Sequence, residues 1–228
     1  MTARLSAIVV LLLAAGLVGG CSSSPKPSAS PEKTLAAAKQ KLDATPGVRI
    51  GLATDKLPTG VNGLLAAHGV GTHAPAFKGA IKVAVSGVTA DASVVAVHDA
   101  VYAKLPFTTK FVKINPADYG APDPAALLRP QGGLSSLLTA AKDVTAGDQV
   151  RQGKQVLSSF SATVPGRAVA AVIPSADAKA DFDGTFTVDD HDQLAKVVLT
   201  GPFYPRGGDV TYTVTFQDYG VTQHITAP

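Results

Sequence analysis

Apolar residues in the body of this chain recur first at a helical spacing and then at every second position. Ser30 and Pro31 suit the N-cap and the first turn of a helix, and Glu32 places an acid near the positive helix end. We expect this helix to end at Gly47 and a strand to follow over residues 48–52. The apolar residues at helical spacing are Leu35, Ala38 and Leu42.

Most of the remaining chain alternates between apolar and polar residues, which predicts strands. Turn signals such as Asn62-Gly63 and the Asp-rich stretch 189–192 separate them. Short helical patterns interrupt at 123–128, 134–141 and 166–172. Further strands are expected over residues 64–68, 77–85, 92–97, 101–103, 149–151, 155–164, 182–188, 194–200 and 210–217.

The order of these elements predicts an α+β fold in which helices gather on one face of a large antiparallel sheet. Residues 31–228 contain no internal repeat and no second domain boundary, so we expect a single domain. A sheet long enough to curl and covered by apolar helices leaves room for a cavity between the layers. Concave apolar spaces of this kind are where small ligands usually bind.

The N-terminus has the pattern of a secretory signal. Arg4 precedes an apolar run over residues 7–18, which is shorter than the roughly 20 residues of a membrane-spanning helix. Val18-Gly19-Gly20-Cys21 resembles the bacterial lipobox, so residues 1–20 are expected to be removed and Cys21 to be lipidated. An ordinary signal peptide with a chance cysteine, or a short membrane anchor, is the alternative.

Cys21 is the only cysteine of the chain, and lipidation would remove a free thiol from an oxidising compartment. Each buried methylene adds about 0.8 kcal/mol to membrane binding, so two or three acyl chains would anchor the protein stably. Residues 21–30 are rich in Ser and Pro and nearly free of apolar side chains, so we expect a disordered tether.

Charge and motifs exclude several classes of function. Removing Arg4 with residues 1–20 lowers the formal charge from +3 to +2, and no basic cluster indicates nucleic acid binding. No hydrolase, zinc-protease or phosphate-loop motif occurs, so we expect no enzyme activity and no cofactor. Residues 189–192 could bind a cation, but a solvated hairpin loop is the favoured interpretation, and no metal site is predicted. The five histidines are His68, His73, His98, His191 and His224.

Three apolar stripes are the remaining candidates for a binding site. Such stripes are more often plain core than the lining of a ligand pocket, and the pattern alone leaves both possibilities open. The stripes are Ile81, Val83 and Val85; Val95 and Val97; and Leu134, Leu137 and Leu138.

Several segments, in order, resemble the mycobacterial lipoprotein family that includes LprG, LprA, LprF and LppX. Residues 99–103 are similar to the family's Asp-Gly-x-Leu-Tyr turn, residues 117–130 to its Asp-Pro-x-x-x-Leu-x-Pro segment, and residues 132–138 to its Gly-Leu-x-x-x-Leu helix. Residues 190–194 and 218–225 also fit. The chain departs from the family in having no Trp and in carrying Ala100 where the family has Gly; residues 55–73 match poorly.

The resemblance implies a curled antiparallel sheet, a half-barrel, with helices packed on its concave face and an apolar cavity between them. It implies a carrier of acylated lipids or glycolipids, held by Cys21 on the outer face of the cytoplasmic membrane and working alongside an integral membrane exporter. A scaffold or interaction lipoprotein with a solid core is the alternative. Carried onto this chain, the resemblance makes the three stripes candidates for lining the cavity.

Overall fold

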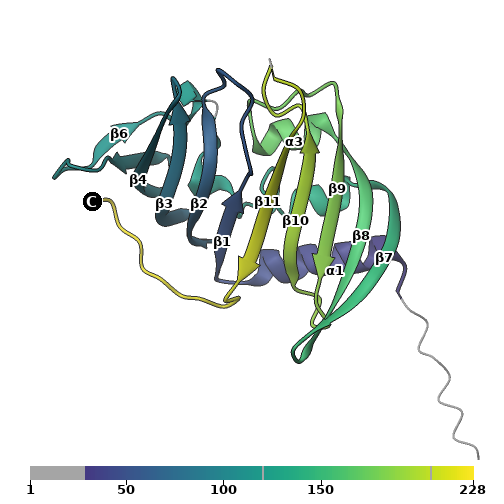
Figure 1. The fold of residues 1–228 in the computed structure, drawn as a ribbon. Helices are drawn as coiled ribbons and strands as arrows, with labels where there is room; N and C mark the ends of the chain where they lie inside the picture. Colours follow the sequence, from purple (N-terminus) through teal and green to yellow (C-terminus); the bar gives the residue numbers. More distant parts are fainter. Residues whose placement is uncertain (1–28, 120, 206) are drawn as a thin grey trace, which may run out of the picture.

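A computed structural model describes residues 29–119, 121–205 and 207–228 of the protein. Within them, the strands form one antiparallel eleven-stranded sheet in the order β6-β5-β4-β3-β2-β1-β11-β10-β9-β8-β7 (Figure 1). The sheet does not close, because β6 and β7 are its two edges. The strands are β1 Gly47–Ala53, β2 Gly63–Thr72, β3 Ala76–Val85, β4 Val88–Val97, β5 Ala100–Lys104, β6 Val112–Ile114, β7 Lys142–Gln152, β8 Gln155–Pro165, β9 Asp181–Val188, β10 Leu194–Gly201 and β11 Val210–Gln217.

The helices are few and short after the first one. They are α1 Pro31–Ala44, η1 Pro116–Tyr119, η2 Pro124–Ala126, α2 Ser136–Ala140 and α3 Gly166–Val172, where η marks a 3-10 helix. The sequence predicted the start of α1 and the bounds of α3 correctly. The predicted helix at 123–128 is a single 3-10 turn, in which the Asp123 carboxylate accepts a hydrogen bond from the Ala125 amide. No helix of the described residues is long and apolar enough to cross a membrane.

The first helix ends earlier than predicted. It stops at Ala44, Thr45 is already extended, and Gly47 begins β1. Pro46 explains the difference, because a proline disfavours helical backbone in the residue before it. Several strands are longer than predicted: β7 begins at Lys142 rather than near residue 149, β4 begins at Val88, and β2 continues to Thr72. The short edge strand β6 was not predicted.

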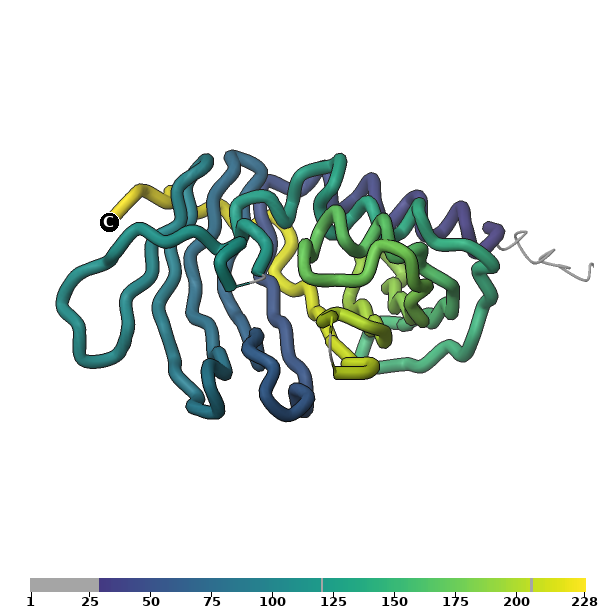
Figure 2. Tube along the Cα trace, turned by 90° about the horizontal axis from the view of Figure 1, so that it is seen from above, coloured from purple at the N-terminus to yellow at the C-terminus, as the bar shows by residue number. Residues whose placement is uncertain are grey.

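The α-helices cover one face of the sheet over only half of its width. Directly paired residues of an antiparallel sheet point to the same face, so register assigns each side chain either to the helix face or to the opposite, outer face. Seen from above, α1 and α3 lie over the C-terminal strands, whereas the strands of the other half run without a long helix across them (Figure 2). The main hydrophobic cluster lies under these helices and includes Leu35, Leu42, Val164, Phe182, Phe186 and Phe203.

The outer face has its own small cluster, formed by the C-terminal segment. The Gly220 amide donates to the Gly47 carbonyl and to the Thr45 hydroxyl, which holds the segment against the start of β1. Farther along, Ile225 packs on Ala76 and Val95 of the outer face (Figure 1).

Every described helix and strand, and every member of these clusters, lies between residues 31 and 228. A chain beginning at residue 22 therefore contains every described helix and strand. The predicted domain bounds stay a prediction. Residues 1–28, with the predicted signal and Cys21, lie outside the described residues.

Candidate functional site

An aliphatic surface covers the helix face of strands β1 to β4. Register aligns Leu52 of β1 with Ala67 of β2 and Ile81 of β3, and Ile81 with Ala92 of β4. The next row toward the β3–β4 turn consists of Leu64, Val83 and Ala90, followed by the pair Val85 and Val88. We call this surface the open apolar face; its members are Leu52, Leu64, Ala67, Ile81, Val83, Val85, Val88, Ala90 and Ala92.

The opposite end of the same helix face is closed by packing. Phe77, Val94, Ala96 and Val101 form a buried cluster with Ala125 of η2, and Ile81 packs against its margin. The Phe77 ring lies over two glycines that face each other, because a Cβ on Gly69 or Gly79 would come within 2.5 or 2.8 Å of its tip. Missing side chains on β2 and β3 thus make room for the ring.

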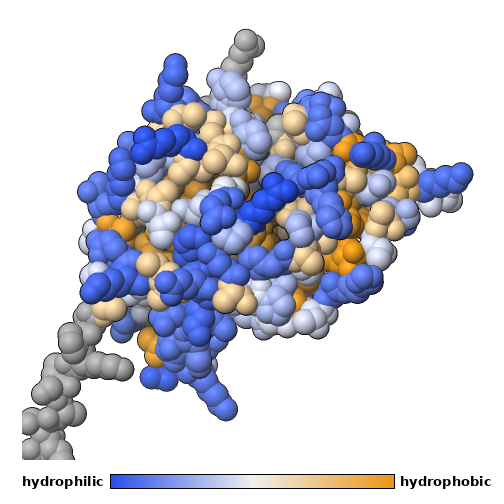
Figure 3. Space-filling model, turned by 180° about the vertical axis from the view of Figure 1, so that it is seen from behind, coloured by the Kyte–Doolittle hydropathy of each residue, from blue (hydrophilic) through white to orange (hydrophobic). Residues whose placement is uncertain are grey.

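Exposure rises from this cluster toward the β3–β4 turn. Ile81 and Val83 are half-buried, Val85 is 41% exposed and Val88 is 67% exposed. Seen from behind, apolar atoms reach the surface on the side that carries β3 to β6 (Figure 3). Aliphatic side chains that gain little burial from folding remain free to be buried by a ligand.

Two tyrosines border the open apolar face on the β11 side. The Tyr212 hydroxyl donates a hydrogen bond to the Leu64 carbonyl at 2.7 Å. The Tyr204 hydroxyl lies 2.7 Å from the Tyr212 hydroxyl. Burial, with the hydrogen bond to Tyr204, raises the pKa of Tyr212 above its ordinary value. Tyr212 therefore stays a neutral donor at any physiological pH, and the pair serves to hold this border together.

The predicted site residues divide between the two faces of the sheet. Ile81, Val83 and Val85 lie on the helix face, as a common lining requires. Val95 and Val97 lie on the outer face, because they pair with Lys78 and Ala76 while their neighbours Val94 and Ala96 point to the helix face. The two stripes therefore face opposite sides of the sheet in this structure, and a part for Val95 and Val97 in lining a cavity stays a prediction.

The leucine stripe lies inside the main hydrophobic cluster. Leu137 and Leu138 are 1% and 2% exposed in α2, and Leu134 precedes them at 9%. They pack between the neighbouring helices and β8 and are filled core in this structure. Their part in lining a cavity stays a prediction.

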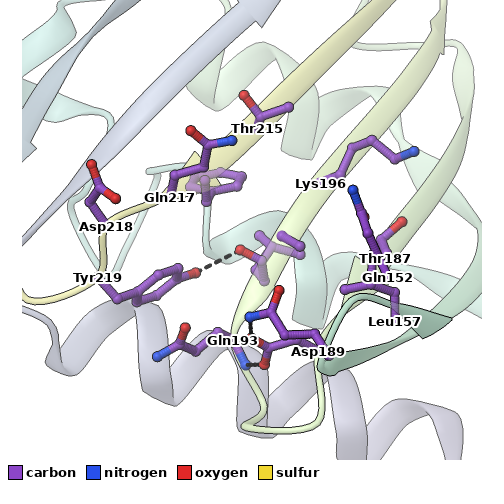
Figure 4. A pocket seen from close by; sticks show the side chains of 14 residues that line it. Gln152, Leu157, Thr187, Asp189, Gln193, Lys196, Thr215, Gln217, Asp218 and Tyr219 are labelled. Carbon is purple, nitrogen blue, oxygen red and sulfur yellow. Dashed lines mark hydrogen bonds between the residues drawn. The ribbon is translucent and has the colours of Figure 1, made fainter. Parts of the chain in front are cut away.

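Among the residues that the structure describes, the predicted enclosed apolar cavity is not seen. The best-formed hollow of the described residues has a volume of about 530 Å³ and is lined mainly by polar side chains, among them Gln152, Lys196, Gln217 and Asp218 (Figure 4). A second hollow, of about 380 Å³, lies between β7, β8 and β9 and is also largely polar. Neither offers the lining that acyl chains need.

The Asp-rich hairpin at the rim of the larger hollow is organised by its own hydrogen bonds. The buried Asp189 carboxylate accepts from the amides of His191 and Gln193, both through Oδ1. The atoms of Asp189, Asp190 and His191 that could bind a metal ion lie within 4.8 Å of one another. The Asp189 carboxylate, however, already accepts the hydrogen bonds that form the turn. The arrangement explains the hairpin between β9 and β10 without a cation.

Sequence reasoning missed most of the open apolar face. Leu52, Leu64 and Ala67 sit in predicted strands, but alternation within a strand does not reveal which strands become neighbours or which faces match. Tyr204 and Tyr212 carried no signal beyond hydrophobicity. Only the tertiary register brings these residues beside Ile81.

Comparison with known proteins agrees with the fold. The solved structure of LprF of Mycobacterium bovis is similar, with a TM-score of 0.69 at 15% identity, and the match covers 87% of this chain and 96% of LprF. The solved structure of LppX of Mycobacterium tuberculosis is also similar, with a TM-score of 0.62 at 14% identity, and the match covers 86% of this chain and 98% of LppX. The lipoarabinomannan carrier protein LprG of Mycobacterium tuberculosis is 26% identical over 235 residues, covering 99% of this chain and 95% of LprG. The model of the LppX_LprAFG lipoprotein family matches residues 30–224, and the chain belongs to that family.

Proposed function

We propose that this lipoprotein binds acylated lipids or glycolipids on the open apolar face and carries them across the cell envelope. The observation that carries the proposal is the continuous aliphatic surface from Leu52 to Val88, which folding leaves partly exposed. The relative named as a lipoarabinomannan carrier supports it, because that name identifies a glycolipid as the cargo of a similar chain.

Hydrophobic burial supplies the binding energy for such a ligand. Removing apolar surface from water is worth roughly 25 cal/mol per Å², or about 0.8 kcal/mol for each buried methylene. An acyl chain laid along the rows that contain Ile81 and Val83 would bury surface on both partners. No catalytic residue is needed, which agrees with a family of carriers and lipoproteins.

The cavity is part of this proposal. A bound lipid would lie on the half of the sheet that no α-helix covers, with η2 and the Phe77 cluster closing one end and the β3–β4 turn open at the other. The covered half, with Leu134, Leu137 and Leu138, would form the opposite wall if α2 moves outward on loading.

We further propose that residues 1–20 are removed and that Cys21 is lipidated, with residues 21–30 as a tether. A lipidated Cys21 would hold the domain on the outer face of the cytoplasmic membrane, and membership of a lipoprotein family supports this proposal. An integral membrane exporter is the proposed partner that would supply or receive the cargo.

Native mass spectrometry of residues 22–228, expressed in a lipid-rich host, tests the carrier proposal. Omitting Cys21 keeps its own acyl chains from confusing the result. We expect a near-stoichiometric acylated lipid to remain bound, and solvent extraction to release it. A protein that is empty and also takes up no added glycolipid would contradict the proposal and favour a scaffold lipoprotein.

A further inference from the structure

The hairpin between β5 and β6 carries large apolar side chains that the fold leaves in water. It spans residues 105–111 at the β6 edge of the sheet (Figure 1). The Phe107 ring is fully exposed, Leu105 is 52% exposed and Val112, at the start of β6, is 56% exposed. Three apolar residues that are close in sequence and uncovered make this tip unlike a usual polar turn.

The backbone of the tip holds Phe107 outward at an unfavourable dihedral angle. The Thr108 amide and hydroxyl both donate to the Leu105 carbonyl, at 3.2 and 2.8 Å, which closes a turn with Pro106 and Phe107 in its middle. Phe107 has a φ of +68°, the region that normally favours glycine. Both the positive φ and the exposed ring make phenylalanine an unfavourable residue at this position in water. A backbone outlier of this kind points to a function.

The base of the same hairpin is positively charged. Lys104, Lys110 and Lys113 flank the tip, and no acidic residue occurs between Asp99 and Asp118. The Lys104 ammonium lies 5.4 Å from the centre of the Phe111 ring. Phe111 in turn packs on the outer-face cluster around Ile225, so the base is fixed to the sheet while the tip projects.

We propose that this hairpin docks on the surface of an anionic lipid bilayer. Phe107 and Leu105 enter the boundary between headgroups and acyl chains, and the three lysines lie at the level of the phosphates. Apolar side chains surrounded by cations are the combination that binds an interface, since each part supplies a separate attraction.

Docking here would bring the bilayer beside the open apolar face, a consequence that rests on the proposed carrier function. Ala103, two residues before Leu105, pairs with Val94 on the helix face, and Val94 belongs to the cluster against which Ile81 packs. A lipid leaving the bilayer at the hairpin would meet an aliphatic surface rather than water. The hairpin would thus set where cargo enters or leaves.

Co-sedimentation of residues 22–228 with vesicles tests the docking. The truncated protein lacks Cys21, so any vesicle binding must come from the folded domain. We expect binding to vesicles of phosphatidylcholine with phosphatidylglycerol, weaker binding to phosphatidylcholine alone, and loss of binding at high salt. Phe107→Gly should weaken binding about tenfold or more, while the melting temperature stays unchanged or rises because glycine accepts the positive φ. Val150→Gly, which removes an exposed apolar side chain from β7, is the matched control.

Reversing the charge of one lysine separates the electrostatic contribution to vesicle binding from the hydrophobic one. Lys110→Glu should reduce binding to the anionic vesicles, and Lys154→Glu, in the exposed turn between β7 and β8, should not. Wild-type protein that ignores anionic vesicles, or Phe107→Gly protein that binds as well as wild type, would overturn the proposal. The carrier function is measured separately, from the lipid that co-purifies with the protein. A protein that binds vesicles but holds no lipid would contradict the carrier function and still support membrane docking by the hairpin.

Discussion

The Tyr212 hydroxyl on β11 donates a hydrogen bond to the Leu64 carbonyl on β2, at 2.7 Å, across the intervening strand β1. Residues 148 positions apart in the chain are thereby joined at the border of the open apolar face. The bond ties the helix-covered half of the sheet to the half that lies open.

Removing that hydroxyl should weaken this junction. Tyr212→Phe leaves the Leu64 carbonyl and the Tyr204 hydroxyl without their partner, so we expect a loss of about 1–2 kcal/mol in the free energy of unfolding. Urea denaturation of residues 22–228 measures it. Tyr119→Phe, at an exposed position, is the control and should change stability by less than about 0.5 kcal/mol. Equal stability of the two variants would mean that the bond contributes nothing.

Filling the open apolar face should lower lipid loading without unfolding the domain. Ile81→Trp places a larger side chain among Ala67, Val83 and Ala92. We expect lipid affinity to fall at least about fivefold, since overpacking costs about 1 kcal/mol or more. Lipid per protein by native mass spectrometry is the measurement, and circular dichroism checks the fold.

Lys82→Trp is the matched control for that experiment. Lys82 is the next residue of β3, is exposed, and points to the outer face beside Asp91. Loading should remain at the wild-type level. Unchanged loading in Ile81→Trp would count against this face, and loss of loading in both variants would indicate a general effect on the fold.

A partly buried polar contact joins α1 to the start of α2. The Ser135 hydroxyl, 1% exposed, donates to the Asp43 carboxylate at 2.6 Å, and Asp43 also pairs with Lys39. Ser135→Ala should reduce the free energy of unfolding by about 1–3 kcal/mol, because the hydrogen bond to a charged group is lost. Thermal melting compares it with Ser161→Ala on the exposed outer face. A melting temperature equal to that of the control would rule this contact out as a stabilising one.

The hairpin between β9 and β10 should depend on one of its acids and not on its neighbour. Asp189→Ala removes the acceptor of the His191 and Gln193 amides, and we expect a loss of about 1.5–3 kcal/mol. Asp190→Ala should cost less than about 1 kcal/mol, since its pair with His191 is exposed. Denaturation midpoints decide between them. If Ca²⁺ raised the stability of the wild type but not of Asp189→Ala, the interpretation without a cation would be wrong.

Local patterns in the sequence determined the parts of this protein that depend on neighbours along the chain. Ser30-Pro31 begins α1, Gly166–Val172 is a helix, and alternation such as Val210 to Phe216 predicts strands, because capping, propensity and one-sided burial act over a few residues. The motifs in their order also identified the family, which the match over residues 30–224 confirms.

Local signals failed where a distant partner decided the outcome. The three residues of β6 have too little pattern of their own and become a strand because they pair with β5. The first half of β7 lacks clear alternation because this edge strand is exposed on both faces and is interrupted by register shifts.

The candidate site was decided by tertiary structure alone. Val83 and Val95 look alike in the sequence, yet register places Val83 on the open apolar face and Val95 beneath Ile225 on the other side of the sheet. The sequence of a strand reveals only that its side chains alternate between two faces. A shift of one residue in pairing moves every side chain to the opposite face. Which apolar stripe is core and which remains open therefore depends on eleven strands finding one register together, and that information is spread over the whole chain.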